Sequence, residues 1–179
     1  MKVATIILII LLLIGILAIL YFNFYNKLSY LFSKTKYAED LIDKDLDKKY
    51  KLLVKINNLM KKTLHAKKDY LVAINDFSSE ELFSSEKDVK LKEYTTTVNN
   101  LISDYTKLAN HKEIKKQVNN LHEIDEKLDA SKTYFNKYMV ELSKLSTKLP
   151  TSLIAKVNKI KVKQLYETNE TIKKISEDL

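Results

Sequence analysis

The fold of this chain is decided by residues 114–149, which read IKKQVNNLHEIDEKLDASKTYFNKYMVELSKLSTKL. Apolar side chains recur there three and four residues apart, so they lie along one face of a helix and must pack against a partner. We predict that this helix begins with a cap formed by Asn110 and Glu113. It should end near Leu149, because Pro150 cannot continue the hydrogen-bond ladder. The apolar seam consists of Ile114, Val118, Leu121, Leu128, Phe135, Met139, Leu142 and Leu149.

Two charged residues, Asp125 and Lys132, occupy positions of this apolar seam. They are two helical turns apart, so we predict that both belong to a buried polar layer that fixes helix register at some cost in stability. The expected partners lie on an earlier helix and are Asp43 and either Lys48 or Lys49. A small internal ligand or ion site is the alternative interpretation of the same residues.

Residues 27–149 contain neither glycine nor proline, which argues against the tight turns of a sheet protein and favours long helices. One helix is predicted from about Lys27 to Asp76. A serine-rich break at residues 76–86 precedes a second helix. Capping-box spacing recurs in this break, at Ser78 with Glu81 and at Ser85 with Asp88. The second helix carries an apolar stripe at Leu91, Tyr94, Val98, Leu101, Tyr105 and Leu108.

The chain after Pro150 is predicted to form a short helix from Thr151 to Asn158. Residues 159–167 alternate in polarity and favour an extended segment, and residues 168–179 form a charged tail. The densest positive stretch is made by Lys156, Lys159, Lys161 and Lys163. A solvated loop explains these lysines, and contact with anionic lipid at a membrane surface is the alternative.

The N-terminal residues 3–22 read VATIILIILLLIGILAILYF and carry no charge. An apolar run of roughly 20 residues is long enough to cross a bilayer as one helix. Aromatic residues cluster at its far end and Lys27 follows them, as at a membrane interface. A cleaved secretory signal is the rival interpretation, but its apolar core is usually about 7 to 15 residues long and ends at a small-residue cleavage site. We therefore expect a retained anchor.

The predicted fold class is all-α. An N-terminal transmembrane helix is followed by an antiparallel helical bundle of three long helices and a short C-terminal helix. The expected domains are a single-pass anchor at residues 1–26, the bundle at residues 27–158 and a C-terminal extension at residues 159–179.

The charge pattern excludes several classes of function. All 31 basic residues are lysine, against 23 acidic residues, and the chain has no arginine and no cysteine. It therefore lacks the side chain best suited to bidentate phosphate recognition, and disulfides and cysteine nucleophiles are excluded. The lysines are mixed with acidic residues and accompany no recognition motif, so we do not expect nucleic-acid binding.

Catalytic motifs are also missing from the sequence. His122 and Glu123 are not followed by the second histidine of a zinc hydrolase, and no glycine-rich phosphate loop or Gly-x-Ser-x-Gly motif occurs. We predict that the protein is not an enzyme and that it uses no cofactor and no metal.

Several segments carry a resemblance to a known family. They are residues 25–28, residues 42–52, residues 108–110 and residues 125–155, which include the Leu-Pro-Thr-Ser-Leu-Ile-Ala stretch at 149–155. Their order and spacing resemble the bacterial LemA family, although Asp125 stands where the family usually has glutamate and Lys132 where it has arginine. The resemblance implies a divergent member with a short N-terminal anchor and an all-helical bundle.

We expect a non-catalytic scaffold or interaction module at the bacterial cell envelope. A membrane-anchored sensor or ligand-binding bundle is the alternative. The expected partners are the lipid bilayer and either another protein or a second copy of the chain. Lys27, Lys34 and Lys36 follow the span, whereas only Lys2 precedes it, and this asymmetry favours a cytoplasmic domain in a single-pass cell-membrane protein.

Overall fold

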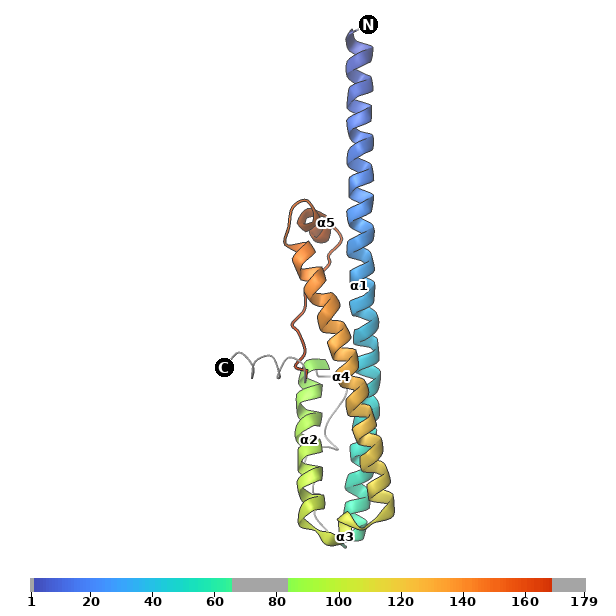
Figure 1. Cartoon of the computed structure of the whole chain (residues 1–179), viewed down its shortest axis with the longest axis vertical. Helices are drawn as coiled ribbons and strands as arrows, with labels where there is room; N and C mark the ends of the chain where they lie inside the picture. Colours follow the sequence, from blue (N-terminus) through green and yellow to red (C-terminus); the bar gives the residue numbers. More distant parts are fainter. Residues whose placement is uncertain (1, 66–83, 169–179) are drawn as a thin grey trace. The chain divides into compact units, whose positions relative to one another are not determined.

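The computed structural model describes residues 2–65 and 84–168, and every regular element in these ranges is a helix (Figure 1). This confirms the all-helical prediction. The helices are α1 (Lys2–Thr63), α2 (Ser84–Asp104), α3 (Thr106–Ala109), α4 (Lys112–Ser146) and α5 (Thr151–Val157).

Helix α1 begins with the apolar run. Within the described ranges it is the one helix that is long and apolar enough to cross a membrane, as a span or as a signal anchor. Every side chain from Val3 to Asn23 is exposed, and the helix continues without a break past Asn23 and Asn26. The apolar run and the following helix are therefore one element.

Helix α1 ends well before the predicted Asp76. The Leu64 amide donates to the carbonyl oxygen of Met60 at 3.0 Å, and His65 has a positive φ of 50°. A residue in this left-handed conformation commonly ends a helix, so the apolar periodicity overestimated the length of α1. The rest of that prediction and the Ser78–Glu81 cap lie outside the described residues.

Two other helix ends differ from the predictions. Tyr105 has extended backbone angles and separates α2 from α3, so the stripe from Leu91 to Leu108 is divided between two helices. The cap of α4 is His111 rather than Asn110, because the amide of Ile114 donates to His111 Nδ1 at 3.4 Å. Glu113 instead accepts a hydrogen bond from Gln117, and this bond, with a smaller effect of Lys55, lowers the pKa of Glu113.

The chain forms two compact units, and the first consists of residues 1–38 and 134–165. Here α1 and α4 run antiparallel, since Tyr30 contacts Tyr138 with ring centroids 6.4 Å apart and Lys34 is hydrogen-bonded to Tyr134. The charge interaction with Tyr134, followed by that with Tyr30, raises the pKa of Lys34. The core of the first unit includes Leu28, Leu31, Phe135, Met139, Leu142, Ile154 and Ala155.

The second unit consists of residues 39–133 and 166–179, of which residues 66–83 and 169–179 are not described. It contains the later part of α1, the earlier part of α4, and all of α2 and α3. Its buried apolar side chains include Ile42, Leu46, Leu53, Ile56, Met60, Leu91, Val98, Leu108, Ile114, Leu121 and Leu128. The stripe predicted on residues 91–108 is confirmed in part: Leu91, Val98 and Leu108 are buried, whereas Tyr94 and Leu101 are partly exposed and Tyr105 is exposed.

The seam of α4 ends earlier than predicted. Helix α4 stops at Ser146, and the side chain of Leu149 is exposed rather than buried. The buried Thr151 hydroxyl lies within hydrogen-bonding distance of the carbonyl oxygens of Leu145, in the last turn of this helix, and of Lys148, two residues beyond its end. The short helix predicted after Pro150 is confirmed as α5.

Candidate functional site

The polar residues predicted on the seam of α4 lie in the second unit, where each is paired with a residue of another helix. Lys49 of α1 donates to Asp125 of α4 at 2.6 Å. The Lys49 side chain is buried, whereas Asp125 is partly exposed. Lys49 is one of the two lysines expected to pair with this seam, and the bond joins α1 to α4.

Lys132 of α4 is paired with Asp88 of α2. The Lys132 Nζ atom is 2.6 Å from both carboxylate oxygens, and the two side chains are only 11% and 12% exposed. Such a pair is stabilising only when its hydrogen bonds compensate for the removal of both charges from water, and here both oxygens are used. This is the most buried ion pair in the described part of the chain.

Asp88 was missed by the sequence analysis, which assigned it to a capping box with Ser85. The structure contradicts that assignment, since both Asp88 oxygens bind Lys132 and Ser85 already lies within α2. One signal could have identified Asp88: it is three residues before Leu91 and therefore on the buried face of α2.

A third pair joins α2 to α1. Lys87 donates to Asp47, and the Lys87 side chain is buried although Asp47 is half exposed. Each of the helices α1, α2 and α4 is thus linked to each of the other two by one lysine–aspartate pair. We call these the three interhelical pairs: Lys49–Asp125, Lys132–Asp88 and Lys87–Asp47.

The structure places Asp43 and Lys48 outside the interhelical pairs, contrary to the prediction for a partner of Asp125 or Lys132. The Lys48 side chain is 52% exposed and pairs with Asp45 on the same helix at 2.6 Å. Successive residues point about 100° apart around a helix, so Lys49 can face α4 while Lys48 cannot. The Asp43 carboxylate accepts a hydrogen bond from the Ser84 hydroxyl at the start of α2.

Tyr166 lies beside this polar layer in the second unit. Its side chain is buried, and burial raises its pKa to about 12. A hydrogen bond with Ser84 acts in the opposite direction, while the acidic side chains of Glu39, Asp43 and Asp88 add to the increase. The phenol is therefore neutral at physiological pH.

This arrangement is suited to fixing helix register. All six charges of the interhelical pairs are neutralised by their partners, and no buried side-chain nitrogen or oxygen within residues 2–65 and 84–168 lacks a hydrogen bond. The described residues also contain no group of three histidine, aspartate or glutamate side chains positioned to hold a metal ion. A shift of one helix along another would separate all of its charged pairs at once, so the geometry of the pairs is compatible with a role in holding one register.

The four lysines proposed for lipid contact belong to the first unit. Lys156 is on α5, and Lys159, Lys161 and Lys163 lie in the segment after it. All four side chains are exposed, and none belongs to the polar layer of the second unit.

Comparisons with protein-family models, with curated proteins and with solved structures give no match to this chain. The resemblance to the LemA family therefore stays a prediction from the sequence.

Proposed function

We propose that this chain is a single-pass membrane protein whose helical bundle is a non-catalytic scaffold or interaction module at the bacterial cell envelope. The observation that carries the proposal is the apolar segment 3–22 of α1. All of its side chains are exposed, and it continues directly into a charged helix that is packed in both compact units. An exposed apolar surface of this extent marks a membrane or protein interaction site, and its length of about 20 residues matches the hydrocarbon core of a bilayer.

The scaffold role is supported by the way the chain uses its buried charges. Each charge of the three interhelical pairs is bound to an opposite charge of the protein. These groups therefore serve to hold the helices in a defined register rather than to bind a substrate. A fixed register presents a constant exposed surface, which is what an interaction module needs. The proposed arrangement is an antiparallel bundle of three long helices with a short C-terminal helix, as in the LemA family that the sequence resembles.

The distribution of lysine favours a cytoplasmic position for the bundle. Within residues 27–38 and 134–165 of the first unit, Glu141 is the one acidic residue. Lysine-rich segments close to a membrane span are retained on the cytoplasmic side. The lysines in these two segments are Lys27, Lys34, Lys36, Lys137, Lys144, Lys148, Lys156, Lys159, Lys161 and Lys163.

A membrane-anchored sensor or ligand-binding bundle is the second candidate. One observation favours it: α1 is a single helix from Lys2 to Thr63, so the same element would cross the membrane and supply buried residues to the polar layer. A change at either end of such a helix can be transmitted to the other end. Ligand-dependent stabilisation of the protein would support this candidate over the scaffold.

The anchor is tested by alkaline extraction of membranes from cells that produce the full chain. We expect the protein to stay in the membrane pellet, and the L11K/L12K variant to be released, because each charge at the centre of a span costs roughly 2.5–3.5 kcal/mol. The matched control is N99K/N100K, which adds the same charges to exposed positions of α2. Release of the unchanged chain would refute the anchor.

The side of the membrane and the partner are tested together in intact cells. Protease added outside should leave the bundle intact until the cells are lysed, and crosslinking followed by mass spectrometry should recover a specific protein. Digestion in intact cells would contradict the cytoplasmic assignment. Recovery of lipid alone would contradict the scaffold role.

A further inference from the structure

The pairing of α1 with α4 in the first unit fixes which part of the chain lies near the end of the apolar segment. Tyr138 is level with Tyr30, and Tyr134 is level with Lys34. Four residues forward on α1 therefore correspond to four residues backward on α4. Continuing this register places Ser146, the last residue of α4, level with Phe22, the last residue of the apolar segment.

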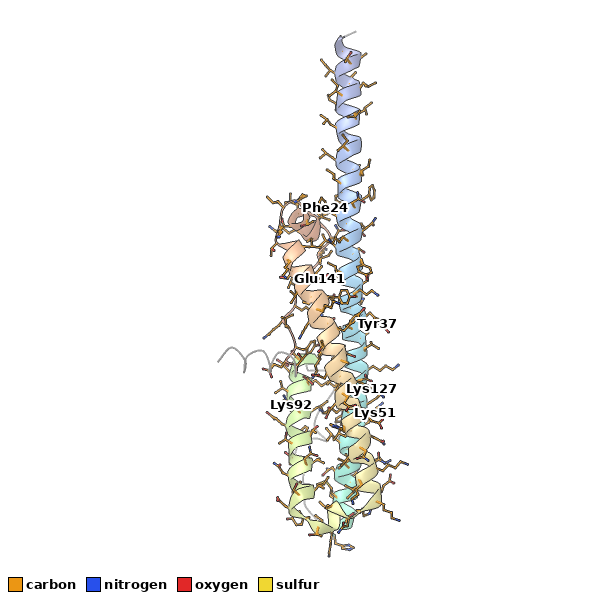
Figure 2. All side chains as sticks on the ribbon, in the orientation of Figure 1. Phe24, Tyr37, Lys51, Lys92, Lys127 and Glu141 are labelled. Carbon is orange, nitrogen blue, oxygen red and sulfur yellow. The ribbon has the colours of Figure 1, made fainter. Side chains whose placement is uncertain are left out.

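Burial along α1 agrees with this register. Side chains are exposed from Val3 to Asn23, and Phe24 is the first that is partly buried. Figure 2 labels Phe24 on α1 at the same height as α5, which follows the end of α4. Helix α5 therefore lies at the level where α1 would leave the hydrocarbon core.

Helix α5 has apolar side chains on two faces. Ile154 and Ala155 are buried in the first unit. Leu153 and Val157 are spaced four residues apart on α5 and so share another face, on which they are 58% and 74% exposed. Leu149, which precedes the helix, is also 76% exposed. Exposing large apolar residues in this pattern is typical of a surface that is covered by another phase or molecule.

Lysines flank these exposed apolar residues in the sequence. They are Lys148, Lys156 and Lys159, and all three are exposed. The first unit outside the membrane segment has ten lysines and one acidic residue, whereas the second unit has 20 lysines and 22 acidic residues. The positive charge of the chain is thus concentrated in the unit that carries the apolar segment, as attraction to anionic phospholipid requires.

A complete cap holds α5 in this short form. The amide of Ile160 donates to the Ala155 carbonyl at 3.0 Å and the amide of Lys159 donates to the Lys156 carbonyl at 3.1 Å. Lys159 has a positive φ of 52°. This is a Schellman motif with lysine at the position usually taken by glycine. The cap reverses the chain, and the following segment returns along α4, where the Lys163 amide contacts the Met139 sulfur at 3.3 Å.

We propose that α5 and its flanking residues form a membrane-surface foot, defined as residues 147–163, that rests on the leaflet from which α1 emerges. Leu149, Leu153 and Val157 enter the boundary between headgroups and acyl chains, and the lysines contact anionic phospholipid headgroups. A helix of this length binds a bilayer weakly by itself, but α1 holds it at the surface and so makes the contact intramolecular. This inference rests on the proposed membrane anchor.

The absence of cysteine makes the test direct, because single cysteines can be introduced and labelled without background. The full chain is reconstituted in vesicles of equal parts phosphatidylcholine and phosphatidylglycerol, with an environment-sensitive fluorophore at L153C or V157C. We expect a blue-shifted emission and strong quenching by lipids that carry a nitroxide near the headgroup. The matched control is V89C, since Val89 is also an exposed apolar residue but lies in the second unit.

Failure of the foot can be distinguished from failure of the anchor. A label at L12C should be quenched by lipids with a nitroxide near the end of the acyl chain. Quenching at L12C together with no more quenching at L153C and V157C than at V89C would overturn the foot and leave the anchor intact. No quenching at L12C would refute the anchor itself.

The role of charge and the alternative occupants are tested with the same labels. The K156Q/K159Q/K161Q/K163Q variant should reduce quenching at L153C several-fold, as should vesicles of phosphatidylcholine alone, whereas the control K51Q/K90Q/K92Q/K127Q should not. A blue shift that disappears on dilution of the protein, without quenching by lipid, would mean that a second copy covers this face and would overturn the proposal.

Discussion

The pair between Lys132 and Asp88 gives the sharpest test of how the helices are held in register. Replacing Asp88 by leucine removes the carboxylate that binds Lys132 through both oxygens and leaves the ammonium almost fully buried. Breaking a buried pair in this way costs about 3–5 kcal/mol, and we expect about 3 kcal/mol because each side chain is slightly exposed. For a chain of this size that corresponds to a melting temperature about 6–12 °C lower.

The assay is thermal unfolding of the full chain in detergent, followed by far-ultraviolet circular dichroism. The double variant D88L/K132L should unfold within about 1 kcal/mol of the unchanged protein, since a buried pair can often be replaced by apolar residues of similar volume. The matched control is K55M, which breaks the exposed Lys55–Glu113 pair between α1 and α4 and should cost less than about 1 kcal/mol. The reasoning would be refuted if D88L were as mild as K55M, or if the double variant were no more stable than D88L.

Three further predictions concern single side chains. L121A should destabilise the protein by about 2–5 kcal/mol because Leu121 is buried. L149A should leave the stability in detergent unchanged because Leu149 is exposed, and chemical denaturation of the two variants measures the difference. K159G should stabilise α5 by about 1 kcal/mol, because glycine adopts the observed φ of 52° without strain, and slower amide hydrogen exchange in residues 151–157 would show it. Because the pKa of Tyr166 is raised from 10.0 to about 12, its contribution to stability is present below pH 10 and is lost as the pH rises toward 12. The free energy of unfolding of Y166F should therefore decrease less steeply with pH in this range than that of the unchanged protein. Equal slopes would contradict a phenol that is buried in its neutral form.

The sequence was sufficient for the class of fold and for most of the apolar face of α4. Six of the eight seam residues are fully buried, because a heptad pattern without glycine or proline leaves the backbone no better option than a long helix. The exceptions are Val118, which is only partly buried, and Leu149, which is exposed.

Helix ends were less predictable than helix faces. Four ends differ from the predictions, at Thr63, at Tyr105, at His111 and at Ser146. Each depends on the backbone angles of one or two residues, for which periodicity carries no information. His65 and Lys159 both adopt a left-handed conformation, but neither is the glycine that normally signals such a helix end in a sequence.

The polar layer could be predicted only in part, and the reason differs from that for the helix ends. Asp125 and Lys132 are visible from sequence because charges interrupt an apolar seam, and Lys49 was one of two neighbouring lysines proposed as partners. Asp88 and Lys87 could not be paired by the same reasoning, since their partners are 44 and 40 residues away and depend on how α2 meets the other helices. Long-range pairing follows from tertiary packing, which local spacing does not specify.

The position of α1 at the start of the chain has a consequence for biosynthesis. Its buried residues, from Leu28 to Met60, are translated long before their partners on α4; Lys49 and Asp125 are 76 residues apart. Translation adds about 5–20 residues per second, so in the proposed membrane protein the apolar stripe of α1 waits several seconds for α4 while its N-terminal segment is engaged with the insertion machinery. During this interval the nascent chain must be shielded from aggregation, and a ribosome stalled before α4 would release a tethered α1 that lacks its α4 partner.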